Sequence, residues 1–354
     1  MPSARTRSSV REGCSDVLAP VLERLRHESP AVLGIDGAAI EVVARISRPY
    51  SEIAKVRVTG SAHPQGWFVK VARLRRDGPE EFEHMSKRVA RDYAMTKHVY
   101  ESMPNGLGLS VVRPVVCYPE HLALVTEEAP GNTLLAETER GVAWWRKSRS
   151  ATSIERVAAR AGAWIDAFQK TDVARPDLSQ SAIRDYIDLR LARLAGHPRA
   201  EFSEDDRRDV LVVLDRELAA LSGPRLDSVP IHGDLALGNV LVDGDRVVVL
   251  DFAMTTRGSR YEDVAHLYMQ IGLLGMKPHF RAARAAQLQR ALLEGFSAGP
   301  IEHDPLFRIM RLQHVACHYL GLVTRPAGLR SRAYNSWVAR HHLVWLRQLA
   351  SVGN

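Results

Sequence analysis

The sequence predicts an α+β chain built from two lobes, a small β-rich N-terminal lobe and a larger, mainly helical C-terminal lobe. Its 354 residues are enough for two lobes, and 45% hydrophobic with 25% charged residues is typical of a globular protein. Short β-like runs recur between residues 39 and 127, on either side of one helix-like stretch, whereas helical periodicity dominates after residue 134. An Ala-Pro-Gly break at residues 129–131 separates the two patterns. We therefore divide the chain into an N-terminal helical extension (1–36), an N-terminal lobe (37–129) and a C-terminal lobe (130–354).

The N-terminal lobe is expected to follow the order β-β-β-α-β-β, behind a helix at residues 12–27. The turn Arg48-Pro49-Tyr50 joins the first two strands. Lys70 stands in the third strand, in an otherwise apolar run. Because the chain has seven lysines against 41 arginines, a lysine in such a strand is conspicuous. The predicted strands are 39–47, 51–60, 67–71, 109–117 and 122–127, and the predicted helix is 80–103.

The C-terminal lobe is expected to be a series of helices interrupted by one stretch of different character. Apolar residues recur at helical spacing between Ile154 and Phe168. The exception is residues 229–252, which read VPIHGDLALGNVLVDGDRVVVLDF. Further helices are expected at residues 182–195, 204–221, 261–274, 280–296, 306–322 and 332–349.

Residues 229–252 carry the polar groups that phosphoryl transfer from a nucleotide requires. Asp234 lies in a loop after an apolar run, Asn239 follows five residues later, and Asp251 ends a hairpin. In such a reaction one carboxylate orients the attacking hydroxyl and accepts its proton, while an amide oxygen and a second carboxylate hold magnesium against the phosphates. The alternative for Asp234 is a turn residue after a buried strand, and for Asn239 a bond to the loop backbone.

The pattern His232-x-Asp234-x4-Asn239, followed after eleven residues by Asp251, resembles the aminoglycoside phosphotransferase and choline kinase-like family, which has the bilobed protein-kinase-like fold. The resemblance extends, in the order of elements, from residue 39 to residue 350. It implies that Asp234 is the catalytic aspartate and that Asn239 and Asp251 bind Mg²⁺. His232 is expected to brace the loop structurally. Asp263, which matches the family's Asp-Leu-Ala segment, is also expected to support the site structurally.

The same resemblance assigns nucleotide-binding roles in the N-terminal lobe, across a cleft that would hold the site. Lys70 would contact the α- and β-phosphates of ATP, with GTP as the alternative nucleotide. Asp92 would pair with Lys70, and Glu81 and Glu83 are the rival carboxylates. Ser51, in the turn that stands in place of a glycine-rich loop, would contact the β-phosphate through its hydroxyl or backbone. The structural alternatives are a solvated strand edge for Lys70 and a plain hairpin turn for Ser51.

Composition and charge argue against several other classes of protein. No apolar run reaches the roughly 20 residues of a membrane span, and the basic N-terminus lacks the apolar stretch of a secretory signal. The three cysteines are widely separated and form no disulfide or metal pattern, which fits a cytoplasmic protein. The net charge is +7, but the basic residues are dispersed and no nucleic-acid motif occurs. We therefore expect neither a nucleic acid nor a membrane as partner.

The charge of the C-terminal segment bears on the acceptor. Residues 264–354 contain ten arginines and one lysine against three acidic residues. Because a basic lobe repels a polycation, we expect a small-molecule hydroxyl acceptor that is a neutral or anionic, sugar-like metabolite. The alternatives are an aminoglycoside, choline or ethanolamine kinase, a protein serine/threonine kinase, and a catalytically silent nucleotide-binding scaffold. The missing glycine-rich loop and the sequence Asp-Phe-Ala at 251–253 disfavour the protein kinase.

Overall fold

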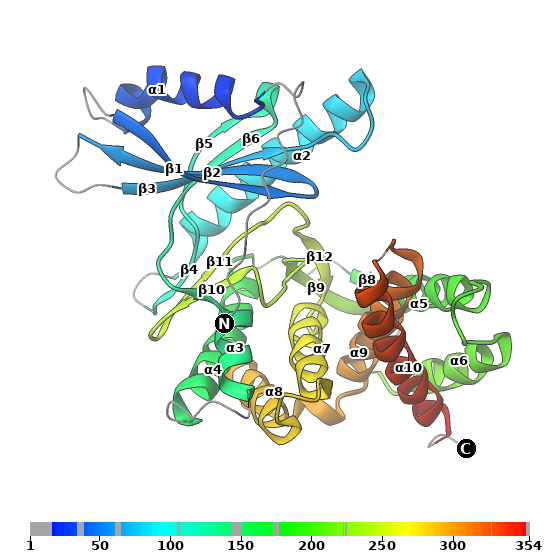
Figure 1. Cartoon of the computed structure of the whole chain (residues 1–354). Coiled ribbons are helices and arrows are strands. Elements are labelled where there is room, and N and C mark those ends of the chain that lie inside the picture. Colours follow the sequence, from blue (N-terminus) through cyan, green and yellow to red (C-terminus); the bar gives the residue numbers. More distant parts are fainter. Residues whose placement is uncertain are drawn as a thin grey trace. The chain divides into compact units, whose positions relative to one another are not determined.

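The computed structural model describes residues 16–33, 39–60, 65–104, 107–143, 151–172, 174, 177–221, 223, 225–326 and 328–351. The chain forms two compact units. The first comprises Met1–Lys97 with Val112–Glu128, and the second comprises His98–Val111 with Ala129–Asn354. The start of the helix predicted at residues 12–27 lies outside the described residues. Each unit is considered by itself below (Figure 1).

The first unit is an antiparallel sheet with helix α1 on one face and helix α2 on the other (Figure 1). The strand order β1-β2-β3-β6-β5 makes β3 the central strand. On the α1 face, Val21 and Leu25 pack into one buried cluster with Val56, Trp67 and Val69. Burying such side chains stabilises the unit by roughly 1.5–3 kcal/mol each. The elements are α1 (Ala19–Leu33), β1 (Ala39–Arg48), β2 (Ser51–Thr59), β3 (Gln65–Ala72), α2 (Pro79–Ser102), β5 (Pro114–Tyr118), η1 (Pro119–His121) and β6 (Ala123–Glu127).

One predicted strand is two strands in the structure. The apolar run at residues 109–117 forms β4 (Leu109–Val111) and β5. β4 pairs in parallel with β11 (Arg246–Val249) of the second unit, whereas β5 pairs with β6. Val112 and Arg113 separate the two strands, β5 begins at Pro114, and the register of the β5–β6 pair shifts next to Pro114. The prediction of one continuous strand was wrong because proline has no N–H to continue a ladder.

The second unit combines helices with two small sheets that carry the polar loops. One sheet has the strand order β4-β11-β10-β7 and the other has the order β12-β9-β8. The strands are β7 (Asn132–Thr133), β8 (Asp177–Ser179), β9 (Arg225–Ile231), β10 (Val240–Asp243), β11 and β12 (Thr256–Ser259). The helices are α3 (Leu134–Val142), α4 (Ala151–Gln169), α5 (Gln180–Ala195), α6 (Glu204–Ala219), α7 (Glu262–Met276), α8 (Ala282–Phe296), η2 (Ile301–His303), α9 (Pro305–Thr324) and α10 (Leu329–Ser351).

These elements confirm the predicted α+β class, with a small antiparallel sheet lobe and a larger helical lobe. The helices predicted after residue 154 are all present, with ends that differ by a few residues. Within the described part of the chain, none of the helices combines the length and the apolar character that crossing a membrane requires.

Helices α4 and α8 approach closely because a glycine lies on each of them where they cross. A Cβ atom on Gly162 would lie 2.1 Å from the Leu292 carbonyl oxygen. A Cβ atom on Gly295 would lie 1.9 Å from the Ala159 carbonyl oxygen. These distances are far inside van der Waals contact, so a larger residue would force the two backbones apart. Both positions therefore require glycine.

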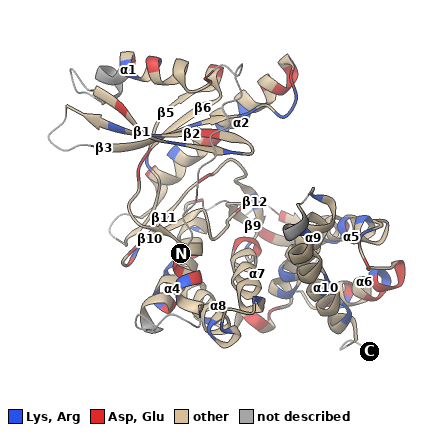
Figure 2. Ribbon diagram, in the orientation of Figure 1, with Lys and Arg blue, Asp and Glu red and all other residues tan. Residues whose placement is uncertain are grey.

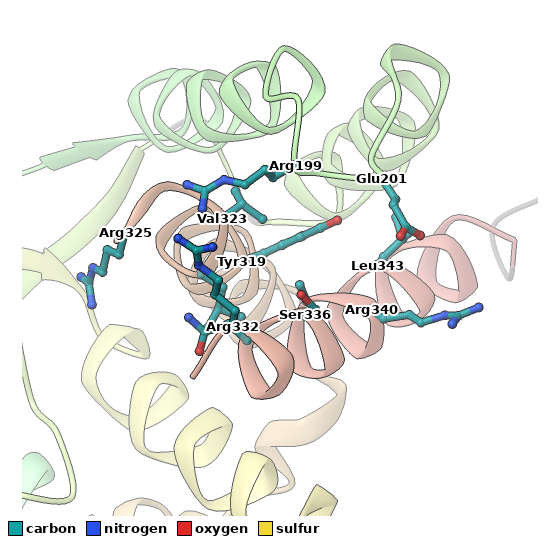
Figure 3. Close-up of a pocket in the computed structure, with 12 residues that line it drawn as sticks. Arg199, Glu201, Tyr319, Val323, Arg325, Arg332, Ser336, Arg340 and Leu343 are labelled. Carbon is teal, nitrogen blue, oxygen red and sulfur yellow. The ribbon is translucent and has the colours of Figure 1, made fainter. Parts of the chain in front are cut away.

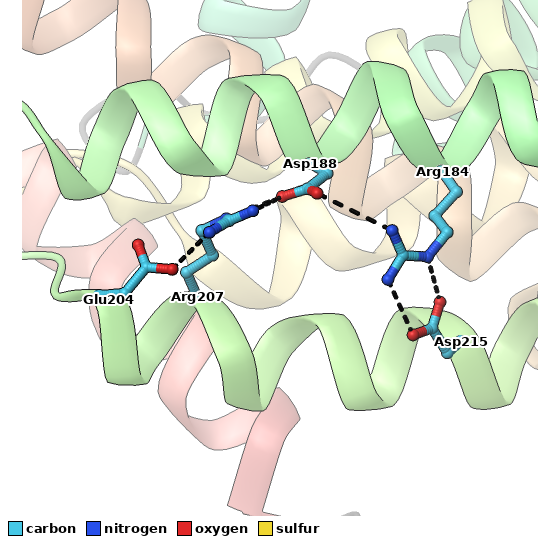
Figure 4. Close-up of polar contacts among 5 residues, drawn as sticks. All are labelled: Arg184, Asp188, Glu204, Arg207 and Asp215. Atoms are coloured by element: carbon cyan, nitrogen blue, oxygen red, sulfur yellow. Dashed lines mark hydrogen bonds and ion pairs between the residues drawn. The ribbon is translucent and has the colours of Figure 1, made fainter.

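Helices α5 and α6 are joined by a chain of ion pairs (Figure 4). Arg184 binds Asp215 with two hydrogen bonds, 2.7 Å from Nε and 3.1 Å from a terminal nitrogen. Asp188 accepts from Arg207 at 2.6 Å and lies 3.8 Å from Arg184. Arg207 also bonds Glu204 within α6. Because these side chains are partly exposed, each pair contributes at most about 1 kcal/mol, and the network mainly fixes how the two helices align.

Candidate active site

The polar loop of residues 232–239 connects β9 to β10 and begins with a turn that only glycine fits. Gly233 has φ +79°, and a Cβ atom there would lie 2.5 Å from the Met254 carbonyl oxygen. The left-handed conformation and the close backbone approach both exclude other residues. Asp234 follows directly and is exposed. The glycine therefore turns the chain sharply at the end of β9, and this turn presents the Asp234 side chain at the surface.

A buried carboxylate at the start of α7 holds this turn in place. Asp263 accepts hydrogen bonds from the backbone N–H of His232 at 2.7 Å and of Gly233 at 3.1 Å. Burial raises the pKa of Asp263 to about 6, against the opposite effect of the two N–H donors. Asp263 is thus fully occupied by the backbone of the loop, and its geometry is that of a brace.

His232 ties the same loop to the strand that follows it. Its Nδ1 lies 3.3 Å from the Asp234 backbone N–H, which donates, so Nδ1 is the unprotonated nitrogen. Nε2 then carries the proton and donates to the Leu250 carbonyl oxygen at 2.9 Å. Burial lowers the pKa of His232 and keeps the ring neutral, although the charges of Asp251 and Asp234 act in the opposite direction. Both ring nitrogens are used in holding backbone.

Asn239 joins the loop to both ends of the β10–β11 hairpin. Its side-chain Nδ2 donates to the Asp234 carbonyl oxygen at 3.1 Å. Its backbone oxygen accepts from the Leu250 N–H at 2.9 Å. With Nδ2 directed at the loop, the amide oxygen is the atom of Asn239 that suits a hard metal ion. The structure thereby brings Asn239 beside the Asp234 backbone and next to the residue before Asp251.

Asp251 occupies a strained backbone position between two anchors. Its φ is +68°, in the left-handed region that residues other than glycine rarely adopt. For an L-residue this conformation costs about 1–2 kcal/mol. On one side, Leu250 is bound to both His232 and Asn239. On the other side, the Phe252 ring is fully buried and lies 4.9 Å from the His232 ring. Strain of this kind persists where the surroundings fix it, and it concentrates at functional sites.

The donor set formed by these residues is compatible with magnesium. Among the described residues, no group of three or more histidine, cysteine, aspartate and glutamate side chains is placed to hold a metal ion by itself. Mg²⁺ sites in nucleotide-dependent enzymes use one or two carboxylates together with water and substrate phosphates. Asn239 and Asp251 are oxygen donors of this type.

The sequence-predicted residues of the first unit are arranged around the central strand of its sheet. Lys70 lies in β3 between Ile53 of β2 and Leu124 of β6, and it is half-buried. It is therefore not on a strand edge. Its neighbours Val69 and Val71 face the α1 cluster. Since side chains alternate along a strand, Lys70 projects to the opposite face.

The strand register places Asp92 on the same side of the sheet as Lys70. Leu124 of β6 lies opposite Lys70 of β3 on one side and opposite Cys117 of β5 on the other. Because directly opposed residues point to the same side of a sheet, these three side chains share a face. Cys117 contacts the Val89 carbonyl oxygen of α2 at 3.8 Å, and burial and the Asp92 charge together raise its pKa to about 11. Asp92 is buried on α2 and contacts Thr96.

The two rival carboxylates lie elsewhere on α2. Glu83 is exposed and forms an ion pair with Lys87 at 2.6 Å. Glu81 lies in the first turn of the helix. Asp92 is the one of the three carboxylates that is buried.

The turn that replaces a glycine-rich loop is held by side chains. Ser51 is the first residue of β2, pairs with Arg48, and is buried rather than at the tip, which is formed by Pro49 and Tyr50. The Arg73 N–H donates to the Tyr50 carbonyl oxygen at 2.9 Å. The Arg73 guanidinium bonds the Ser47 hydroxyl at 3.0 Å and also the Glu52 carboxylate.

A second layer beneath the loop was not predicted. The Leu237 N–H donates to the Gln270 amide oxygen at 3.0 Å, and Gln270 bonds His266 at 2.9 Å. The His266 ring stacks on His314 of α9 at 4.7 Å, and His314 bonds the Glu262 carbonyl oxygen at 2.8 Å. The spacing of four residues between His266 and Gln270 was the available signal, because it places both on one helix face.

Comparison with known proteins agrees with this architecture. Residues 53–303 match the phosphotransferase enzyme family (APH). No curated protein sequence matches the chain. Among solved structures, aminoglycoside phosphotransferase APH(4)-Ia is 14% identical, with a TM-score of 0.57 over 95% of this chain and 99% of that one. A thermostable mutant of it, in a ternary complex with ADP and hygromycin B, is 12% identical with a TM-score of 0.58 over the same shares.

The macrolide 2'-phosphotransferase MphH from Brachybacterium faecium is 17% identical, with a TM-score of 0.50 over 90% of this chain and 97% of that one. At these identities the likenesses show the fold, and the family follows from the match across residues 53–303, which is more than half of the chain. The chain therefore belongs to the phosphotransferase enzyme family, whose reaction is phosphoryl transfer to a hydroxyl group.

Proposed function

We propose that the protein transfers the γ-phosphate of ATP to a hydroxyl of a small molecule, with Asp234 as the catalytic residue. The observation that carries the proposal is the bracing of the loop at residues 232–239. Asp263 fixes its turn, and neutral His232 fixes the backbone on either side of the hairpin. A carboxylate held this way is positioned to align an acceptor hydroxyl and accept its proton, and positioning is the main part of such catalysis.

Asn239 and Asp251 are proposed to hold Mg²⁺ through the amide oxygen and the carboxylate. Bound magnesium would neutralise the negative charge that develops on the transferred phosphate. The fixed backbone at Leu250 positions both residues before any ligand arrives, since it bonds Asn239 and His232. Preorganised ligands avoid the reorganisation that would otherwise weaken binding.

Lys70 is proposed to bind the nucleotide phosphates, oriented by Asp92. The shared face of Lys70, Leu124 and Cys117 and the effect of Asp92 on Cys117 support this pairing. Strands lie about 4.8 Å apart, so a lysine side chain from β3 can reach a carboxylate above β5. Ser51 would contribute through its backbone, because the residue is buried at the start of β2. ADP in the complex of the APH(4)-Ia mutant supports ATP as the nucleotide.

The acceptor is proposed to be a neutral or anionic, sugar-like metabolite. Lysines and arginines are spread over the helices of the second unit (Figure 2), and residues 264–354 hold ten arginines and one lysine against three acidic residues. Such a surface repels an aminoglycoside. We place the reaction in the cytoplasm, which the free thiols of Cys117 and Cys317 support.

The experiment is a screen for nucleotide consumption that depends on the acceptor, with Asp234→Asn as the test variant. Sugars, sugar phosphates and aminoglycosides would be presented with ATP and magnesium, and ADP release would be measured. We expect a loss of about 10² or more in kcat for Asp234→Asn, with ATP binding retained. Asp243→Asn, at an exposed position in the neighbouring β10–β11 hairpin, is the matched control. Near wild-type turnover by Asp234→Asn would refute the mechanism, and preferential phosphorylation of aminoglycosides would refute the acceptor class.

A further inference from the structure

A pocket in the helical unit, apart from the loop at residues 232–239, has the chemistry of an anion site. It has a volume of about 340 Å³ and lies between the C-terminal half of α9, the N-terminal half of α10 and the connection from α5 to α6 (Figure 3). Pockets for small molecules begin near 300 Å³, so this one suits a ligand of about one sugar ring with a charged substituent.

The floor and the rim of the pocket differ in character. Tyr319, Val323 and Leu343 close the floor and are almost completely buried, with 1%, 5% and 2% of their surface exposed, so they shape the pocket but offer little contact area. The rim carries four arginines, all exposed, which are Arg199, Arg325, Arg332 and Arg340. A small ligand with an anionic end would meet the arginines of the rim while its body fills the pocket.

Charge favours an anion strongly. The lining residues include four arginines and one carboxylate, that of Glu201. In Figure 3 the side chains of Arg199 and Arg332 extend in the same direction, whereas Arg340 points away from the centre. Guanidinium groups bind phosphate and carboxylate through paired N–H donors. Arg199 and Arg332 are therefore the main candidates for holding the anion.

The pocket lies beyond the same end of α7 that braces the catalytic loop. Along α9, Arg311 lies over Tyr268, and His314 bonds the Glu262 carbonyl oxygen, so α9 runs toward the N-terminus of α7. Tyr319 follows His314 by five residues, or roughly 7.5 Å of helix. Asp263, at that end of α7, holds the turn before Asp234.

We propose that this pocket binds the anionic group of the acceptor, a phosphate or carboxylate, through its arginines, while the sugar-like body fills the rest of the pocket and turns its reacting hydroxyl toward Asp234. The inference rests on the proposed phosphotransferase function and adds to it the place and the chemistry of acceptor recognition. It explains why a phosphotransferase of this family carries a basic C-terminal segment: part of the excess charge serves to bind the acceptor.

The first arm of the test measures binding by isothermal titration of the full-length protein. The probes are inorganic phosphate, glucose 6-phosphate and glucose. We expect glucose 6-phosphate to bind more tightly than inorganic phosphate, and glucose not to bind. The double variant Arg199→Ala/Arg332→Ala should weaken glucose 6-phosphate binding by about tenfold or more. Arg193→Ala/Arg290→Ala removes the same charge from exposed positions on α5 and α8 and should change binding by less than about twofold.

A variant with the opposite sign strengthens the test. Glu201→Gln removes the carboxylate from the rim, so it should tighten glucose 6-phosphate binding by about two- to fivefold. Equal binding of the probe to the wild type and to both arginine variants, or no binding to the wild type, would overturn the proposal.

The second arm separates this inference from the proposed function. If acceptors without an anionic group are phosphorylated and the Arg199/Arg332 variant keeps its KM for them, phosphotransfer stands and the anion subsite is refuted. If glucose 6-phosphate binds in an arginine-dependent way but no acceptor is phosphorylated, the subsite stands and the proposed function fails. A raised KM with an unchanged kcat for an anionic acceptor would support both.

Discussion

Acidification should destabilise the helical unit through four histidines on α7, α9 and α10, of which His342 is buried and His266, His314 and His318 are partly buried. Burial lowers the pKa of His266 and His342 to about 3 and that of His314 and His318 to about 4. In the unfolded chain each has an ordinary pKa near 6.5. A histidine that is neutral in the folded state takes up a proton when the chain unfolds in acid. Its contribution to the free energy of unfolding is therefore fully present above pH 6.5 and is lost as the pH falls toward 4. Between pH 7.5 and 5.0 each one removes about 2 kcal/mol.

Two buried carboxylates act in the opposite direction. Burial raises the pKa of Glu262 to about 7 and that of Asp263 to about 6. These groups bind protons more tightly in the folded state, so they stabilise it as the pH falls from 7 to 5, together by about 4 kcal/mol. The histidines together remove about 8 kcal/mol over the same interval. The loss from the histidines is therefore larger than the gain from the two carboxylates, so acidification should lower the free energy of unfolding.

The assay is urea denaturation at pH 7.5 and pH 5.0, followed by tryptophan fluorescence. His342 contacts His318 at 2.7 Å, and His342→Gln keeps a hydrogen-bonding group at this position. The substitution should reduce the acid-induced loss of unfolding free energy by about 2 kcal/mol. His303→Gln, at an exposed position, should leave the loss unchanged. An unfolding free energy that is constant or rises between pH 7.5 and 5.0 would refute the reasoning, as would equal behaviour of the two variants.

Three further substitutions test the site and its support. Asp263→Asn converts an acceptor oxygen into a donor facing a loop N–H, so kcat should fall by about tenfold and amide exchange in residues 232–239 should accelerate; unchanged exchange would contradict the bracing role. Gly295→Ala drives a methyl group into the Ala159 carbonyl, so urea denaturation should show a loss of about 2–3 kcal/mol, and wild-type stability would mean that the helices separate easily. Asparagine adopts the left-handed conformation at least as readily as aspartate, so Asp251→Asn should change the free energy of unfolding by less than about 0.5 kcal/mol. It should lower kcat by about 10² or more, and retained activity at low magnesium would exclude Asp251 as a ligand.

The fold class and the proposed catalytic residues were accessible from sequence because they rest on local patterns. Alternation and turns identified the strands around Lys70, and the spacing from His232 to Asp251 identified the loop and hairpin. The turn at the start of the loop is held by bonds between residues at most 31 apart, such as Asp263 to His232, whereas Leu237 at its far end also accepts from the distant Leu135 N–H. A short stretch of sequence therefore contains most of its determinants.

The features that sequence did not predict depend on contacts between distant residues. The run at 109–117 looked like one strand, and its division follows from β4 pairing with β11, more than 130 residues away. The arginine pocket joins Arg199 to Arg332, which no periodicity relates. The pair of His318 and His342 likewise forms only when α9 packs on α10. Periodicity indicates which face of a helix is buried but not which helix covers it.

The strained conformation of Asp251 depends both on its neighbours in the sequence and on contacts with residues farther along the chain. A left-handed backbone conformation is unfavourable by about 1–2 kcal/mol for an L-residue. Its neighbours offset that strain, because Phe252 is fully buried and Leu250 is bound through both its N–H and its carbonyl. A residue that served only to turn the chain after β11 would be expected to be glycine, which adopts this conformation freely. A carboxylate at a position where glycine would be more stable is what the proposed role of Asp251 as a metal ligand predicts.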